Sequence, residues 1–72
     1  MDNDAFLIKL GFQVALLRKE KGIKQIELAN LCDIERSNMR RIEAGRTNPT
    51  VLTLLKICDA LNISIGKLFE FE

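Results

Sequence analysis

The sequence predicts a small all-α domain, and three of its features support this. The 72 residues include only one proline and four glycines, which leaves little chain for loops. Leu, Ile, Lys and Glu are plentiful whereas Val and Thr are sparse, and this balance favours helices over strands. Apolar side chains recur at helical spacing at Leu7, Leu10, Val14 and Leu17. We expect residues 1–72 to form one domain, whose small core favours self-association.

The first two helices are bounded by residues that cap or break a helix. An acidic or amide side chain within residues 2–4 can cap the first, which runs to residue 19 or 20 and ends at Gly22. The second begins at residue 24 or 25 and ends at residue 31 or 32. Its inward face is expected to hold Leu28, Ala29 and Cys32.

A short turn is expected to separate the second helix from a third over residues 36–44. Asp33 can adopt the left-handed backbone conformation that such a turn requires. Ile34 turns inward, and Met39 and Ile42 then define the buried side of the third helix. Two helices joined by a turn of three or four residues form a helix-turn-helix signature.

Two further helices follow the loop "RTNPT". Thr50 can cap a helix over residues 51–61, and Ser64 can cap a short fifth helix that ends near Phe69. The fourth helix is expected to bury four side chains: Leu54, Leu55, Cys58 and Leu61.

Charge is distributed unevenly along the chain, although the net charge is only +1. Between Arg18 and Arg46 there are eight Lys or Arg against five Asp or Glu, a local charge of +3, while both ends are acidic. On the outward side of the third helix we expect Arg36, Ser37, Arg40, Arg41 and Ala44. Three guanidinium groups on one face repel one another unless they meet an anion or have partners within the helix. Arginine can grip phosphate or the guanine edge with two hydrogen bonds, so nucleic acid is the favoured anion.

Other classes of function have little support in the sequence. There is no histidine, and Cys32 and Cys58 show no metal-ligand spacing, so we expect no metal site and no cofactor. The two thiols are expected to be buried in a cytoplasmic protein. No nucleophile stands near a base, which argues against an enzyme. The apolar run near the start contains Lys9 and Gln13 and is too short to span a membrane.

Residues from about Leu10 to Phe69 resemble the Cro/C1-type (XRE-like) helix-turn-helix family of phage repressors and restriction-modification controllers. The segments that carry the resemblance are "LLRKEKGIKQIELA", "RRIEAGRTNPT" and "LLKICDALNISIGKLF". The resemblance implies a five-helix, lambda-repressor-like fold. It also implies a sequence-specific transcriptional regulator that binds a palindromic operator on double-stranded DNA as a homodimer, with residues 36–44 as the recognition helix.

The resemblance also assigns roles by position. The base contacts it implies are Glu35, Arg36, Ser37, Arg40 and Arg41. The phosphate contacts it implies are Gln25, Asn38, Arg46 and Asn48. Asn48 is equally typical of a turn before proline, and a solvated surface side chain is the alternative for Gln25. Glu43 is expected to pair with Arg18.

The chain departs from the family pattern at three positions. Lys24 and Glu35 stand where relatives commonly have a Ser or Thr cap, and Asp33 replaces the usual turn glycine. Glu35 can accept a hydrogen bond from cytosine N4 or can restrain Arg36. These departures bear on the base sequence that is read, not on the fold.

An apolar stripe on the first helix exceeds the needs of the core. It consists of Ile8, Phe12 and Leu16, and it is expected to be the interface with a second copy or with a partner protein. Packing of Phe12 and Leu16 against the C-terminal "FEF" is the alternative. The alternative function that follows from the stripe is a protein-interaction module of the same fold, such as an antitoxin-like subunit.

Overall fold

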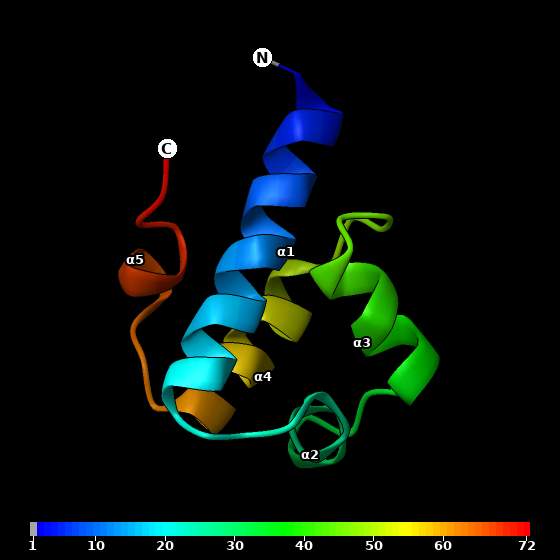
Figure 1. The fold of residues 1–72 in the computed structure, drawn as a ribbon, viewed down its shortest axis with the longest axis vertical. Helices are drawn as coiled ribbons and strands as arrows, with labels where there is room; N and C mark the ends of the chain where they lie inside the picture. Colours follow the sequence, from blue (N-terminus) through cyan, green and yellow to red (C-terminus); the bar gives the residue numbers. More distant parts are fainter. Residues whose placement is uncertain (1) are drawn as a thin grey trace.

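The structure is a computed structural model that describes residues 2–72. Within this range the chain forms five α-helices and no strands, so the predicted all-α architecture is confirmed. The helices are α1 (Asn3–Glu20), α2 (Gln25–Leu31), α3 (Arg36–Glu43), α4 (Val51–Leu61) and α5 (Ile65–Leu68). Helix α1 runs through the middle of the molecule, with α3 on one side, α5 on the other, α4 behind and α2 across the base (Figure 1).

Side-chain caps begin three of the helices at the predicted positions. The Asp2 carboxylate accepts hydrogen bonds from the backbone N–H groups of Asp4 and Ala5, at 3.1 and 3.2 Å. Hydroxyl caps begin the last two helices, where Thr50 accepts from the Thr53 N–H at 3.1 Å and Ser64 from the Lys67 N–H at 3.1 Å. Each cap satisfies backbone donors that have no partner within the helix.

Helix α2 begins without a side-chain cap of that kind. Lys24 is the N-cap residue, and its ammonium group cannot accept a hydrogen bond. The Glu27 carboxylate instead reaches back and accepts from the Lys24 backbone N–H at 3.1 Å, which is one half of a capping box. This contact explains how the chain starts α2 without the Ser or Thr that relatives commonly use.

The turn between α2 and α3 forms as predicted. Asp33 has a φ of 54°, in the left-handed region, and the Ile34 N–H donates to the Ala29 carbonyl at 2.9 Å. The side chain of Ile34 turns inward and packs against the core. Helices α2 and α3 therefore form the predicted helix-turn-helix unit.

The core contains side chains from all five helices: Leu10, Val14, Leu17, Leu28, Ala29, Cys32, Met39, Ile42, Leu54, Ile57, Cys58, Leu61 and Leu68. Two predicted core residues do not lie in the core: Leu55 is 44% exposed, and Leu7 of α1 is only half-buried. Ile57, which was not predicted, is fully buried in place of Leu55. The i, i+3, i+4, i+7 set that starts at Leu54 faces inward, and Leu55 lies about 100° further round the helix.

Both cysteines are free thiols in the core, as predicted. Burial raises the pKa of each thiol above its ordinary value; for Cys32, Asp59 adds to this effect and Lys56 opposes it. Across residues 2–72, no helix combines the length and the apolar character needed to cross a membrane.

Candidate nucleic-acid interface

Helix α3 is held against α1 by a very close approach of the two backbones. Met39 and Ile42 bury the inner face of α3, as predicted. At the crossing point, a β-carbon on Gly11 would clash with the carbonyl oxygens of Ile42 and Glu43, the second at only 2.6 Å. Only glycine permits this contact, and the one signal for it in the sequence, a glycine inside a predicted helix, does not indicate which element approaches.

Gly45 ends α3 and forms a second close contact with α1. Its φ of +72° lies in the left-handed region, and a β-carbon there would lie 2.7 Å from the backbone nitrogen of Ile8. The Gly45 and Arg46 N–H groups donate back to the carbonyls of Ile42 and Arg41, which closes the last turn. The end of α3 is thus fixed on α1, and the direction of the following loop with it.

A buried ion pair joins the same two helices and confirms the predicted Arg18–Glu43 contact. The Arg18 guanidinium donates to the Glu43 carboxylate at 2.7 and 3.0 Å, and to the Ile23 carbonyl at 2.9 Å. The amide of Gln25 donates to Glu43 at 2.9 Å. Gln25 therefore braces α3 from the first residue of α2, and part of its hydrogen-bonding capacity is used within the protein.

The outward face of α3 is open to solvent. The exposed residues on this helix and its two cap positions are Glu35, Arg36, Ser37, Asn38, Arg40, Arg41 and Ala44. None of the arginines among them has an ion-pair partner within residues 2–72, so no intrahelical carboxylate balances the arginines. Glu35 caps no backbone group with its side chain and does not pair with Arg36.

Helical geometry divides this face into a centre and two flanks. Ser37 and Ala44, seven residues apart, lie along its centre line. Arg36 and Arg40 lie toward α2, where they line a small hollow with Gln25 and Ile26. On the other flank, a wider hollow between α3 and α4 is lined by Asp33, Ile34, Glu35, Ser37, Asn38, Arg41, Thr53 and Lys56.

The sequence interpretation missed Thr53 and Lys56 as neighbours of the α3 face. Both lie in α4, and they are brought beside Ser37 and Arg41 by the packing of α4. Their three-residue spacing puts them on one side of α4, and this spacing is the only feature of the sequence that groups them. Whether that side of α4 faces α3 depends on how the two helices pack.

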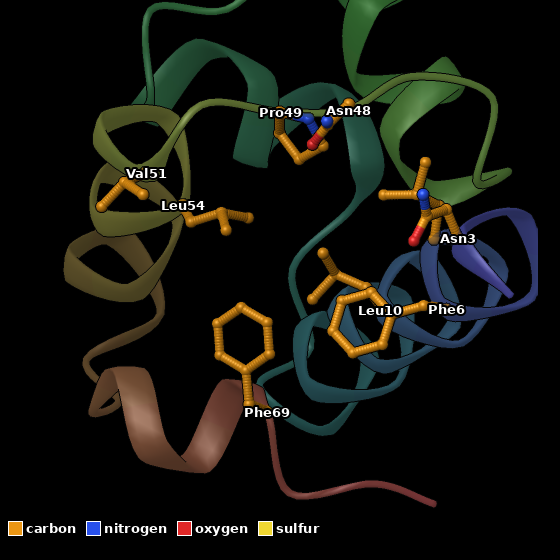
Figure 2. A pocket seen from close by; sticks show the side chains of 9 residues that line it. Asn3, Phe6, Leu10, Asn48, Pro49, Val51, Leu54 and Phe69 are labelled. Carbon is orange, nitrogen blue, oxygen red and sulfur yellow. The ribbon is translucent and has the colours of Figure 1, made fainter. Parts of the chain in front are cut away.

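The loop after α3 carries two predicted phosphate contacts, Arg46 and Asn48, and they lie in different surroundings. Arg46 is exposed and directly follows the glycine that ends α3. Asn48 is also exposed, but it shares a hollow with Pro49, α1 and α4 and not with the α3 arginines. Figure 2 shows this hollow, of about 350 Å³, with Phe6 and Leu10 of α1 facing Leu54 of α4 and Phe69 across it.

Residues 2–72 bring no three His, Cys, Asp or Glu side chains together in a way that could hold a metal ion. The arrangement presents cations, hydroxyl and amide groups on an exposed helix, a chemistry that suits an anionic partner.

Comparison with known proteins identifies the family. The helix-turn-helix family HTH_3 matches residues 14–68 of the chain. The HTH-type transcriptional regulator y4dJ of Sinorhizobium fredii is 38% identical over 55 residues, which cover 76% of this chain and 71% of that protein. The control protein C.MunI of a Mycoplasma species is 34% identical over 64 residues, covering 88% of this chain and 86% of that protein.

A solved structure of another helix-turn-helix regulator has the same fold. The restriction-modification controller protein C.AhdI from Aeromonas hydrophila superimposes with a TM-score of 0.88 at 37% identity, over 90% of this chain and 98% of that one. This similarity confirms the predicted lambda-repressor-like arrangement of the helices. The chain belongs to the HTH_3 helix-turn-helix family, of the Cro/C1 type, whose members are DNA-binding transcriptional regulators and not enzymes.

Proposed function

We propose that this chain regulates transcription by binding a specific sequence of double-stranded DNA, with α3 in the major groove. The observation that carries the proposal is the exposed face of α3, on which three arginines flank Ser37 and Ala44 and have no ion-pair partner in the described part of the chain. The similarity to the HTH-type transcriptional regulator y4dJ and to the controller proteins C.MunI and C.AhdI supports a regulatory role. This role agrees with the cytoplasmic location that two free thiols predict.

The shape of the α3 face suits a groove. Small side chains along its centre allow the helix to approach the base edges closely, while long arginines on both flanks reach outward. We assign base contacts to Glu35, Arg36, Ser37, Arg40 and Arg41. A good bidentate arginine–guanine pair contributes about 1–3 kcal/mol of discrimination.

Phosphate contacts surround this face in the proposed complex. They are assigned to Gln25, Asn38, Arg46 and Asn48, with Lys56 of α4 as an addition beside Arg41. Gln25 is the least free of these, because its amide already donates to Glu43. Such contacts position the protein on the duplex and make its affinity fall steeply with salt.

We further propose that the protein binds as a homodimer to a palindromic operator, with the two α3 helices about 34 Å apart. A second copy would cover an exposed apolar surface on α4 and α5, which we call the α4–α5 surface. It consists of Val51, Leu52, Leu55, Ile65 and Phe69, which are 37–70% exposed. Val51 and Phe69 border the hollow in Figure 2, which offers space for an apolar side chain of the partner.

Two considerations favour the α4–α5 surface for this role. It exposes more large apolar side chains than the stripe on α1, and obligate interfaces are the most apolar class. Val51 and Leu52 also stand in the first turn of α4, directly after the loop that leaves α3. An interface there would fix the spacing of the two recognition helices through only a few residues.

The test is selection of bound duplexes from a random DNA pool, followed by affinity measurements on the selected site. Arg36→Ala is expected to weaken binding to this site by about 5- to 150-fold and to relax the preference at one base pair. Lys67→Ala is the matched control, because Lys67 is an exposed cation on α5, paired with Glu70 at 3.9 Å and distant from α3. Selection of no consensus, or equal losses in both variants, would overturn the proposal.

A further inference from the structure

The α1 stripe (Ile8, Phe12, Leu16) remains open after the chain has folded. These side chains are 56%, 68% and 42% exposed, and they follow one another at i, i+4 and i+8 along one face of α1. The C-terminal segment does not cover them. Phe71 packs on Phe6, with ring centroids 5.5 Å apart, and a hollow of about 320 Å³ remains between Phe71 and the stripe. The alternative in which Phe12 and Leu16 are covered by the chain's own C-terminus was therefore wrong.

The stripe lies on a different helix from the face proposed to bind DNA, and only its first residue, Ile8, approaches that region, through its contact with Gly45 before Arg46. Gly11, one residue before Phe12, contacts the buried side of α3, whereas Ser37 and Arg41 point in the opposite direction from that contact. The stripe also consists of α1 residues only and shares none with the α4–α5 surface. A partner could occupy it while the protein is dimeric and bound to DNA.

We propose that the α1 stripe binds the α1 stripe of a second copy, in an antiparallel two-fold contact centred on Phe12, and so joins two DNA-binding dimers into a tetramer. The spacing is self-complementary: the two-fold sets Phe12 against its own copy and Ile8 against Leu16 of the other chain, twice. Ile8 and Leu16 lie equally far from Phe12, about 6 Å along the helix, so both pairs form together.

The charges of α1 select the antiparallel orientation. Asp4 lies in the first turn and Lys19 in the last turn, so the antiparallel register brings Asp4 within about 1.5 Å of Lys19 of the other chain along the axis, although Asp4 is also level with Glu20 there. The opposed helix dipoles act in the same direction. A parallel pair would place Asp4 against Asp4 and Lys19 against Lys19, which is unfavourable.

The inference rests on the proposed function in one respect, namely that the α4–α5 surface forms the operator-binding dimer. It adds that one tetramer carries two pairs of recognition helices and holds two operators. Association through the α1 stripe would then be independent of the affinity of each dimer for its own operator. A substitution in the α1 stripe and a substitution in the α4–α5 surface are therefore expected to have different effects.

The first test measures assembly and DNA binding separately on the whole chain. In sedimentation velocity at tens of micromolar, the unaltered protein is expected to be a tetramer and Phe12→Glu a dimer. Affinity of Phe12→Glu for a single selected operator is expected to stay within twofold, whereas Leu52→Glu should lower that affinity at least tenfold. Circular dichroism checks that both exposed-site variants fold.

A cross-linking test reports the contact itself and does not depend on DNA binding. Phe12→Cys is expected to be joined to its copy by a short bismaleimide, because packed helix axes lie about 8–10 Å apart. Lys19→Cys is the matched control. The antiparallel two-fold would hold its two copies about 21 Å apart, beyond the reach of the reagent.

The outcomes separate this inference from the proposed function. A tetramer that survives Phe12→Glu, an unaltered protein that is only a dimer, or equal cross-linking at both positions would overturn the α1 contact. If the unaltered protein is only a dimer, the α1 stripe would instead be available to a different protein. Loss of dimer and operator binding together in Phe12→Glu would overturn the division of roles while leaving the regulator assignment intact. Failure to select any DNA, with Phe12-specific cross-linking retained, would remove the proposed function but not the α1 contact.

Discussion

The guanidinium group of Arg18 holds the carboxylate of Glu43 with two hydrogen bonds, of 2.7 and 3.0 Å, and thereby ties α1 to the last residue of α3. Both side chains are less than 10% exposed. The pair has further partners, since Arg18 also donates to the Ile23 carbonyl and Gln25 also donates to Glu43. One network therefore joins α1, α2 and α3.

Glu43→Ala is expected to lower the free energy of unfolding by about 3–5 kcal/mol, because it leaves the Arg18 cation buried without its partner. The total free energy of unfolding of a chain of this size is roughly 4–11 kcal/mol, so the loss is a large part of it. Urea unfolding followed by circular dichroism measures it. The double variant Arg18→Met with Glu43→Leu is expected to be more stable than Glu43→Ala. A double variant that is less stable would show that the pair itself, and not the orphaned charge, accounts for the loss.

Gly11→Ala is expected to lower both stability and DNA affinity, because the added methyl group meets the backbone of α3 and must displace that helix. Overpacking of this kind costs about 1–3 kcal/mol. Gly66→Ala is the matched control, since a β-carbon there would have only the Ser64 hydroxyl nearby, at 3.8 Å. Unfolding midpoints and affinity for the selected operator are measured for both variants. Equal behaviour of the two would contradict the close approach of α1 and α3.

Local signals were sufficient to predict the helices. The caps at Asp2, Thr50 and Ser64 and the left-handed turn at Asp33 involve neighbours within a few residues, and all of them form. The inner face of α3 follows from Met39 and Ile42 in the same way. Such features depend on backbone geometry that the sequence specifies directly.

Features that depend on packing between helices were not predictable from the sequence in the same way. The role of Gly11 exists only because α3 crosses α1 at that residue. The exposure of Leu55, and the position of Lys56 beside Arg41, both depend on the rotation of α4 about its axis. The Arg18–Glu43 pair was expected from family resemblance, since nothing in the spacing of two residues on separate helices indicates it.

Arg46→Ala is expected to weaken DNA binding by a similar factor for every sequence and to reduce the slope of log affinity against log salt by about one. Arg46 is exposed just beyond the end of α3, where the proposed complex would place a cation against the phosphate backbone beside the groove. Affinities for the selected operator and for a scrambled duplex, each at several salt concentrations, provide the measurement. A loss confined to the selected operator would instead identify Arg46 as a base contact.

Stability is expected to decline at alkaline pH because of the two buried thiols. Burial raises the pKa of Cys32 and of Cys58 in the folded protein, so the unfolded chain loses these protons first as the pH rises. Their contribution is therefore fully present below the ordinary thiol pKa of about 8.5 and is lost above it. Urea midpoints between neutral and alkaline pH test this, with the double variant Cys32→Ala and Cys58→Ala as control. An equally steep alkaline decline in that variant would assign the effect to other groups.

Glu35→Ala is expected to change which sequence the protein prefers. Glu35 is exposed at the tip of α3, it neither caps the helix nor pairs with Arg36, and its carboxylate is free to accept a hydrogen bond from cytosine. Removing it should cost about 1–3 kcal/mol at one C·G pair and leave the other positions of the site unchanged. Selection of DNA by the variant, compared with selection by the unaltered protein, measures this directly. If affinity rises equally for all sequences, Glu35 only repels phosphate, and the discrimination at that end of the site comes from Arg36.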